Sequence, residues 1–459
     1  MLSAIVAAAG LCLLLPLPAV SNDGRQKEAV EYLTGLVKID TSNPPGHEIE
    51  AARYIKGILD REGIPSEIVE SAPGRASLIA RLKGSGAKKP LMLMGHLDVV
   101  GVERGKWTVD PFAATAKDGY LYGRGAVDDK GMDAANLAVF LKLHREKVPL
   151  DRDVILLAEA GEEGTSQFGI DYLVAHHWDK IDCEYALNEG GTFNVVAGKL
   201  QYAGVETTEK VPRGLRVVAR GTSGHGSMPR LDNPVTHLAA AVGKIGAWQP
   251  PMRLNETTRE FFARLAAISP PEQARLFTHL EDAAVQETLR AASILYNSML
   301  RTSVVPTIIK GGFRENVIPA EAEAILDVRA LPDEDIDSLM ATLKTLVADP
   351  AVEITRRTEG QRRPAAPASG IHNEMFAALE RAQKRVFPEA ITVPLMQTGA
   401  TDGAQLRAKG VQAYGIGIPM DDEDLHRMHG NDERVSLDAL GRFTDYLYAV
   451  VLDVAGARR

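Results

Sequence analysis

The chain has 459 residues, more than a single hydrophobic core usually serves, so two domains, or one domain with a large insertion, are expected. Hydrophobic residues make up 45% of the chain and charged residues 25%, which argues against a disordered chain and against a polytopic membrane protein. The 52 basic and 61 acidic residues give a formal net charge of −9, and no run of Lys or Arg is long enough to follow a phosphate backbone, so no nucleic acid partner is expected.

The N-terminus, residues 1–21, has the pattern of a cleavable export signal. An uncharged apolar stretch ends before a polar run, and Ala19 and Ser21 are the small residues beside a cut after Ser21. No Lys or Arg precedes the apolar stretch, so a misassigned start codon or an uncleaved anchor stays open. Leu11 stands before Cys12, where a lipoprotein signal needs a small residue, which argues against lipidation.

Cysteine usage favours a compartment of bacterial type. Once residues 1–21 are removed, Cys183 is the one cysteine left, so no intrachain disulfide can form. An exported protein without disulfides indicates a bacterial periplasm or the exterior of the cell. We therefore expect a periplasmic or secreted protein that has no stable membrane association after cleavage.

The segment from residue 26 to about 198 alternates between helical and strand patterns. Helical spacing of apolar residues occurs at 25–39 and 48–63, and short apolar runs at 90–94 and 153–158 are typical of strands buried on both faces. This alternation predicts an α/β fold with a mixed, largely parallel sheet, in which ligands bind beyond the carboxyl ends of the strands.

A different pattern begins near residue 203 and predicts an inserted α+β domain. Its half-exposed strands and its helices are expected at 214–220, 233–248, 302–310, 316–329 and 333–348. Further helices are expected at 250–300, where Leu265, Ile268, Leu276 and Leu280 are interpreted as packing residues of an enlarged lid. The α/β pattern resumes after a Pro/Ala linker at 363–369, with helices at 373–386 and 437–454. The expected division is a catalytic domain at 22–201 and 361–459, with the inserted lid domain at 202–360.

Five short polar motifs could contribute ligands to a metal centre. They are Gly95-His96-Leu97-Asp98, the stretch Gly123 to Gly131, Glu162-Glu163, Asn188-Glu189 and the stretch His429 to Arg434. Most of them lie at or just past a predicted strand end, where an α/β sheet would bring them together. Each motif alone is also compatible with an ordinary loop, but their joint placement predicts a metal site with two histidines and three or four carboxylates.

The first two motifs illustrate the alternatives. His96 could bind a metal while Asp98 orients its other ring nitrogen, or the pair could form a turn with a surface histidine. The glycine-rich stretch around Asp128 superficially resembles a dinucleotide-binding loop, but Asp128 stands at the third glycine position and no strand precedes it. Asp128 and Asp129 are better explained as metal ligands, since one carboxylate can bridge two metals, or as a helix N-cap.

Glu162 and Glu163 present the same choice. Adjacent carboxylates at a strand end repel each other unless a cation lies between them or one of them is protonated. One of the two could therefore bind a metal while the other acts as a base. The alternative is a solvated acidic turn.

The order and wording of these motifs resemble the di-zinc metallopeptidase family of glutamate carboxypeptidase, aminoacylase-1 and succinyl-diaminopimelate desuccinylase, over residues 40–447. The resemblance implies a phosphorylase/hydrolase-like catalytic domain with an inserted α+β lid (dimerisation) domain. It also implies two Zn²⁺ ions per chain, although Co²⁺ or Mn²⁺ would accept the same ligand types. The implied metal ligands are His96, Asp128, Glu163, Glu189 and His429, with Asp128 bridging and Asp98 supporting His96.

The resemblance also implies roles around the reacting bond. Glu162 corresponds to the general base, which takes a proton from a water activated by the two metals and passes it to the departing amine. His225 corresponds to a lid histidine that stabilises the developing oxyanion. Asn316, Arg329 and the turn at Gly399 correspond to residues that bind the substrate carboxylate. A structural salt bridge is the alternative role for Arg329.

These expectations predict hydrolysis of an amide or peptide bond next to a free carboxylate, as in a metallocarboxypeptidase or dipeptidase that acts on small peptides. An N-acyl-amino-acid amidohydrolase of the aminoacylase type is the alternative, and the export signal argues against a biosynthetic desuccinylase. A di-metal aminopeptidase and a catalytically dead binding module are less favoured, because the carboxylate-binding set and all base and ligand positions are present. The resemblance further implies a homodimer formed through the lid domain, in which the lid histidine can act in the neighbour's site, although the enlarged lid could block that contact.

Overall fold

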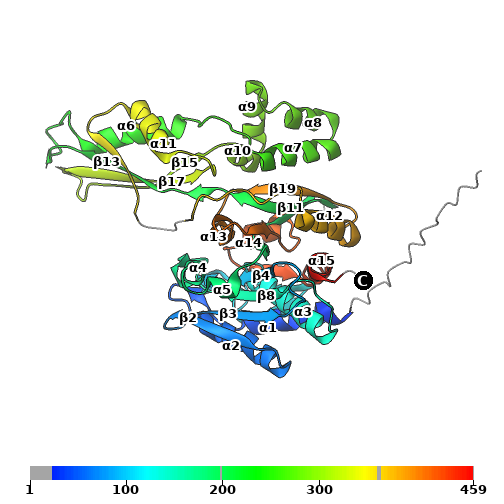
Figure 1. Ribbon diagram of the computed structural model, residues 1–459. Helices are drawn as coiled ribbons and strands as arrows, with labels where there is room; N and C mark the ends of the chain where they lie inside the picture. The colour runs from blue at the N-terminus through cyan, green and yellow to red at the C-terminus, as the bar shows by residue number, and fades with distance from the viewer. Residues whose placement is uncertain (1–22, 197–198, 359–362, 458–459) are drawn as a thin grey trace, which may run out of the picture.

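The computed structural model describes residues 23–196, 199–358 and 363–457, arranged around two β-sheets (Figure 1). The expected export signal at 1–21 lies outside the described residues. No helix within the described ranges is long and apolar enough to span a membrane.

The larger sheet has nine strands and is mixed, which confirms the predicted α/β class. In spatial order its strands are β10 (Thr192–Val196), β11 (Lys199–Glu209), β20 (Gln412–Gly415), β9 (Tyr185–Asn188), β4 (Leu91–His96), β8 (Val154–Glu159), β3 (Arg75–Leu82) and β2 (Ser66–Ala72), and β19 (Ile391–Gln397) pairs with β11. The four central strands β20, β9, β4 and β8 run parallel, while the edges contain antiparallel pairs. The carboxyl ends of these four strands therefore share one edge of the sheet.

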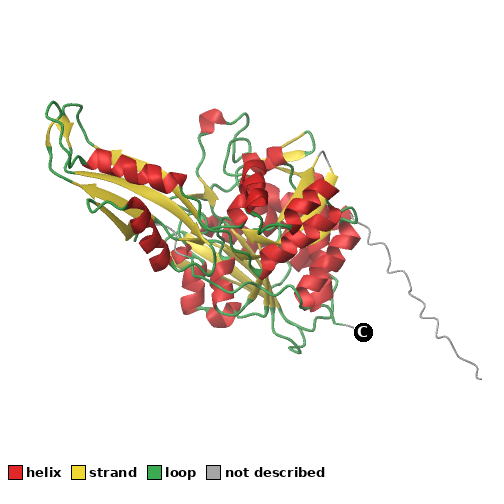
Figure 2. Cartoon of the chain, turned by 90° about the horizontal axis from the view of Figure 1, so that it is seen from above, coloured by secondary structure: helices red, strands yellow, loops and turns green. Residues whose placement is uncertain are grey.

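Helices cover both faces of this sheet (Figure 2), which explains why its central strands are continuously apolar. In β4, Leu91 and Leu93 belong to the core on one face, and Met92 and Met94 to the core on the other. The first face is covered by α1 (Asp23–Val37), α2 (Glu48–Arg61), α3 (Lys130–Arg145), α12 (Glu374–Val386) and α15 (Leu437–Ala455). The second is covered by α4 (Ile170–His176), α5 (Trp178–Ile181) and α13 (Gly403–Ala408).

The smaller sheet is antiparallel, has five strands and carries its own core. Its strands are β12 (Val211–Pro212), β17 (Glu321–Ala330), β13 (Leu215–Arg220), β18 (Val352–Arg356) and β15 (Ser303–Gly311). Buried and half-exposed residues alternate along β17, because α6 (Pro234–Ala247) and α11 (Ile336–Val347) pack on one face only.

Short elements complete the chain and lie mostly in connections. They are β1 (Ser42–Asn43), β5 (Val99–Val100), η1 (Arg104–Lys106), β6 (Thr115–Lys117), β7 (Tyr120–Tyr122), η2 (Ser166–Phe168), β14 (Gly224–His225), β16 (Val317–Ile318), α14 (Asp422–Arg427) and β21 (Arg434–Ser436).

The structure differs from the expected domain limits at the start of the smaller sheet. The expected boundary after residue 201 falls within β11, which continues to Glu209 as a strand of the larger sheet. The composition change near residue 203 therefore lies inside a strand of the larger sheet and does not mark the domain limit. Leu200, Ala203 and Val205 of β11 belong to the main core of the larger domain, and Tyr202 belongs to a core on the opposite face.

The helices of the expected insertion at 250–300 do not belong to the core of the smaller sheet. They are α7 (Glu256–Ile268), α8 (Pro271–Thr278), α9 (Ala283–Ala292) and α10 (Ile294–Met299). Their apolar side chains pack on β11 and β19 of the larger sheet, together with Tyr202 and Val393. Leu265 and Leu280 are buried and Leu276 is partly buried in this core, whereas Ile268 is 41% exposed, so its predicted packing role is wrong.

An aromatic cluster links the inserted helices to the larger sheet, and it allows a test. The Phe261 ring is fully buried and lies 5.8 Å from the ring of Tyr202 in β11. We expect Phe261→Ala to lower the free energy of unfolding by about 3–5 kcal/mol, because it leaves a cavity in a shared core. Ile268→Ala changes an exposed residue of the same helix and should lower the free energy of unfolding by less than about 1 kcal/mol. Urea titration of both variants measures these free energies. Equal costs for the two variants would mean that the helices do not share the core of the sheet.

Candidate metal centre

The five motifs come together at the carboxyl edge of the central parallel strands. His96 ends β4, Glu162 and Glu163 follow β8, and Glu189 directly follows β9. Asp128 lies just before α3, and His429 lies in the loop after α14. Segments more than 300 residues apart in sequence thus meet at one edge of the sheet, as parallel strand ends require.

Asp128 faces both histidines at once. Its Oδ1 lies 3.0 Å from Nε2 of His96, and its Oδ2 lies 2.8 Å from Nε2 of His429. Nε2 of His429 also lies 2.9 Å from Oε1 of Glu163, and Nε2 of His96 lies 4.0 Å from Oε1 of Glu189. Ligand atoms of His96, Asp128 and Glu163 lie within 4.8 Å of one another, as do those of His96, Glu162 and Glu189. A carboxylate placed in this way could give one oxygen to each of two metal ions.

Asp98 contacts both His96 and the loop that carries Glu162 and Glu163. Nδ1 of His96 lies 2.9 Å from the backbone oxygen of Asp98 and 3.5 Å from its Oδ1, so the stronger contact is to the backbone. The carboxylate of Asp98 accepts hydrogen bonds from the backbone N–H groups of Gly161, Glu162 and Glu163. Asp98 therefore orients His96 and also fixes the loop that carries the two glutamates.

The titration behaviour of the cluster reflects crowded negative charge. Burial raises the pKa of Glu162 to about 7, against the lowering effect of Arg363 and His96. Burial and the charge of Glu162 raise the pKa of Glu189 well above its usual range. Hydrogen bonds to Asp128 and Glu163 raise the pKa of His429 to about 10. Because cations placed among these groups would offset both repulsion and burial, the donor set of two imidazoles and several carboxylates fits a pair of divalent metal ions.

Two supporting residues had no role in the sequence interpretation. Glu433, from the same motif as His429, accepts hydrogen bonds from the backbone of Gly125 and Val127 and forms a buried ion pair with Arg124. It thereby holds the loop that presents Asp128, and its place in the His429 motif was the only signal.

Arg363 is the second residue, and no motif pointed to it. Its buried Nη2 donates to Oε1 of Glu162 at 2.6 Å, and its Nη1 contacts Asp402. Its backbone oxygen accepts a hydrogen bond of 2.8 Å from Arg213, which follows β12. Arg363 therefore connects the chain that returns from the smaller sheet to the side chain of Glu162.

The expected lid residues are not all near the metal centre within one chain. His225 and Asn316 are exposed and lie together, since β14 pairs with β16 and Gly226 N–H donates to the backbone oxygen of Asn316. They lie beyond the end of β17 opposite Arg329, and the ten residues of β17 span roughly 30 Å. The smaller sheet extends away from the larger one in that direction (Figure 1).

The other two expected carboxylate-binding positions lie at the base of the smaller sheet and beside the metal centre. Arg329 forms an ion pair with Asp327 at 3.0 Å, as the structural alternative for it predicts, and 34% of its side chain stays exposed, so the pair leaves it accessible to a substrate carboxylate. Gly399 follows β19, in a turn whose Thr401 N–H and Oγ1 both donate to the buried carboxylate of Glu209.

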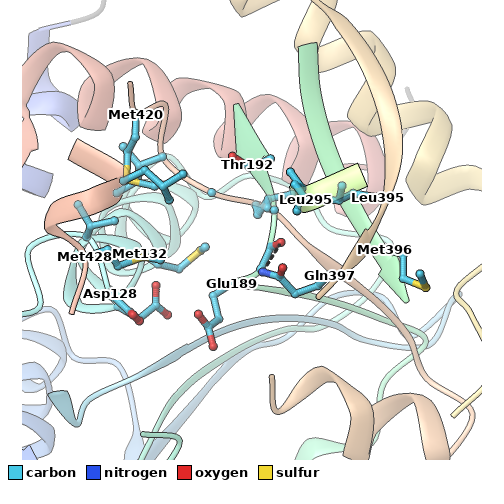
Figure 3. Close-up of a pocket in the computed structure, with 18 residues that line it drawn as sticks. Asp128, Met132, Glu189, Thr192, Leu295, Leu395, Met396, Gln397, Met420 and Met428 are labelled. Atoms are coloured by element: carbon cyan, nitrogen blue, oxygen red, sulfur yellow. Dashed lines mark hydrogen bonds between the residues drawn. The ribbon is translucent and has the colours of Figure 1, made fainter. Parts of the chain in front are cut away.

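A pocket of about 260 Å³ opens beside Asp128 and Glu189 (Figure 3). Met132 of α3, with Met420 and Met428, forms one side, and Leu295 and Leu395 form the other. The full lining is Val127, Asp128, Asp129, Met132, Glu189, Gly190, Gly191, Thr192, Leu295, Leu395, Met396, Gln397, Ile416, Gly417, Ile418, Met420, Leu425 and Met428. We refer to it as the apolar pocket.

Comparisons with known proteins agree with this site. Residues 92–453 match the profile of Peptidase family M20/M25/M40. Human N-fatty-acyl-amino acid synthase/hydrolase PM20D1 is 27% identical over 437 residues, which cover 93% of this chain and 86% of the human protein. A probable succinyl-diaminopimelate desuccinylase of Staphylococcus epidermidis is 31% identical over 312 residues, which cover 68% of this chain and 69% of that protein.

A solved structure shows the same fold. The M20 family metallo-carboxypeptidase Sso-CP2 from Sulfolobus solfataricus matches with a TM-score of 0.68 at 20% sequence identity, over 92% of this chain and 98% of that chain. The family profile spans most of the chain and includes every residue of the metal centre described above. The chain therefore belongs to peptidase family M20/M25/M40 and is a hydrolase of the peptidase and amidohydrolase class.

Proposed function

We propose that this hydrolase cleaves an amide or peptide bond next to a free carboxylate and uses two zinc ions. The observation that carries the proposal is the position of Asp128, with one carboxylate oxygen toward His96 and the other toward His429. In this proposal His96 and Glu189 would hold one ion, Glu163 and His429 would hold the other, and the carboxylate of Asp128, which faces both histidines, would contribute to both sites. Cobalt or manganese would fit the same ligand types, so metal analysis has to decide between them.

Bound metal ions would polarise the substrate carbonyl and make a bound water easier to deprotonate. The carboxylate of Glu162 is the base: it takes the proton of the attacking water and delivers it to the departing nitrogen. The carbon–nitrogen bond breaks, and the products are a carboxylic acid and a free amine. Arg363, at 2.6 Å from Oε1 of Glu162, keeps this side chain in position, and Asp98 fixes the loop on which it stands.

Two substrate classes fit the reaction. Small peptides with a free carboxylate are one, in agreement with the metallo-carboxypeptidase of the same fold. N-acyl amino acids are the second class. The human relative, described as an N-fatty-acyl-amino acid synthase/hydrolase, supports this class, and its alignment covers 93% of this chain. Arg329 and the turn at Gly399 are the groups proposed to bind the carboxylate in both cases.

We further propose export through residues 1–21, with a periplasmic or secreted location, and a homodimer formed through the lid domain. The support for the dimer is an exposed apolar edge made by Val235, Val305, Ile309 and Phe313, which are between 42% and 83% exposed. Among the described residues β15 pairs only with β17, so its other edge is open for pairing. A second lid also explains how His225 and Asn316, roughly 30 Å along the lid, reach a metal centre: that of the neighbouring chain.

The catalytic role of Glu162 can be tested with dipeptides and N-acyl amino acids as substrates. We expect Glu162→Ala to lower kcat at least about 100-fold while the purified protein keeps two metal ions per chain, because Glu162 moves a proton and is not a ligand. Glu67→Ala, which removes a surface glutamate paired with Lys180, should leave kcat unchanged. A wild-type protein without metal, or an active Glu162→Ala variant, would disprove the proposal and favour a binding module.

Arg363 can be tested through stability. We expect Arg363→Ala to lower the free energy of unfolding of the metal-free protein by about 3–5 kcal/mol, because it leaves the buried carboxylates of Glu162 and Asp402 without their countercharge. Arg356→Ala removes an exposed ion pair with Asp337 and should cost less than about 1 kcal/mol. Denaturant titration of both variants measures the difference, and similar costs would show that Arg363 does not balance these charges.

The dimer can be tested by sedimentation. We expect the wild-type protein to sediment at twice the mass of the mature chain and Ile309→Asp to sediment as a monomer, because a charge would have to be buried at the lid contact. Ile294→Asp, which places the same charge at an exposed site on α10, is the control and should leave the dimer intact. A monomeric wild-type protein would exclude the lid dimer and, with it, a role for His225 in a neighbouring site.

A further inference from the structure

The inserted helices bring one side chain into the apolar pocket, and no step of the proposed reaction uses it. Leu295 of α10 lines the pocket and is 45% exposed, while its neighbour Ile294 is 88% exposed and does not line it. Leu295 lies on the side of the pocket that faces Met132 and Met428 (Figure 3). The insertion thus contributes directly to the space beside the metal centre.

The position of α10 is well defined by its contacts. The ring of Tyr296 lies 5.5 Å from that of Phe262 and 5.7 Å from that of Phe277, in the core that covers β11 and β19. The Oγ of Ser298 accepts a hydrogen bond of 3.0 Å from Nζ of the buried Lys210, which directly follows β11. Both contacts attach α10 to the larger sheet. They therefore fix the position of the helix that presents Leu295 to the pocket.

The charge of the pocket lining indicates which part of a substrate binds there, the part with the carboxylate or the part on the carbonyl side of the cleaved bond. Its lining contains no Lys, Arg or His, and its ionisable residues are Asp128, Asp129 and Glu189, all acidic. With Asp128 and Glu189 serving as metal ligands in the proposed function, the remaining lining is mostly apolar and offers a substrate carboxylate no positively charged side chain. The pocket therefore suits the uncharged half of the substrate, on the carbonyl side of the bond that is cleaved.

The shape and chemistry of the pocket indicate an aliphatic group. One wall consists of the thioether side chains of Met132, Met420 and Met428, which are flexible and adapt to irregular apolar surfaces. An apolar cavity of about 150 Å³ is enough to hold benzene. At about 260 Å³, the pocket has room for an apolar group larger than six carbon atoms.

We propose that α10 is a specificity element of this enzyme: Leu295, Met132 and Met428 form a subsite for a straight aliphatic acyl chain on the carbonyl side of the scissile amide. The inference rests on the proposed function and narrows it, because it selects N-acyl amino acids with a long chain over small polar peptides. Binding in this subsite removes apolar surface from water. Each added methylene should therefore raise kcat/KM roughly fourfold, the change that corresponds to ~0.8 kcal/mol, until the pocket is full.

The experiment uses the metal-loaded full-length enzyme and N-acyl derivatives of one amino acid, from acetyl to decanoyl, with the matching dipeptides. We expect kcat/KM to rise with chain length, mainly through KM, since the chain contributes equal binding in the ground state and the transition state. In Leu295→Trp, which fills the subsite, the ratio of decanoyl to acetyl kcat/KM should fall at least about tenfold, as for the loss of two buried methylenes. Ile294→Trp adds the same ring one position away, outside the pocket, and should keep the wild-type ratio.

Failure of the proposed hydrolysis and failure of the acyl-chain subsite give different results. If no substrate of either class is hydrolysed by the metal-loaded enzyme, the proposed function fails. If hydrolysis occurs but kcat/KM is independent of chain length, favours the dipeptides, or changes equally in Leu295→Trp and Ile294→Trp, the subsite is disproved and the proposed function stands. Leu295 is not part of a buried core, so thermal unfolding of both variants should match that of the wild type and confirm that they fold.

Discussion

Buried negative charge at the carboxyl edge of β4, β8 and β9 is the constraint on which the site depends. Carboxylates packed this closely repel one another, and their enclosure removes the water that would otherwise stabilise them. The protein offsets part of this cost with its own groups. His96 and His429 face the two oxygens of Asp128, and backbone N–H groups surround Asp98. What remains is suited to divalent cations, which supply charge that the protein does not.

The supporting contacts are distributed so that each loop of the site has its own anchor. Asp98 fixes the loop of Glu162 and Glu163 after β8. Glu433 fixes the loop before α3 that carries Asp128, although it comes from the C-terminal part of the chain. Arg363 contacts Glu162 from the segment that returns from the smaller sheet. Because these anchors come from different parts of the chain, the site can form only when the whole larger domain is folded, and a change in the return segment can be felt at the catalytic base.

The inserted helices have a different relation to the site from the one their sequence suggested. Their position between strands of the smaller sheet in the sequence predicted an enlarged lid. In the structure they cover β11 and β19, and α10 reaches the apolar pocket through Leu295. An insertion in this place can change the substrate preference without altering the metal ligands, because it contacts the pocket wall and not the ions.

Local sequence patterns were sufficient to predict the central strands of the larger sheet and the edge at which the polar motifs meet. The apolar runs predicted β4 and β8 to within one or two residues, because strands buried on both faces leave no polar positions. The same rule indicated that the polar motifs after those strands would share one edge, and the structure places His96, Glu162, Glu163 and Glu189 there. The end of β11 at Glu209 could not be predicted in this way. The helices that cover this strand lie more than 40 residues later in the chain.

The sequence by itself determined the class of fold and the chemical character of the site, since periodicity and residue type are local properties. Only the tertiary structure decided which groups balance the charge of Glu162, where the inserted helices pack, and that His225 and Asn316 lie far along the lid in a single chain. These are contacts between segments distant in sequence. Their partners are selected by packing and charge compensation in the folded chain, and such selection leaves no regular pattern in the order of the residues.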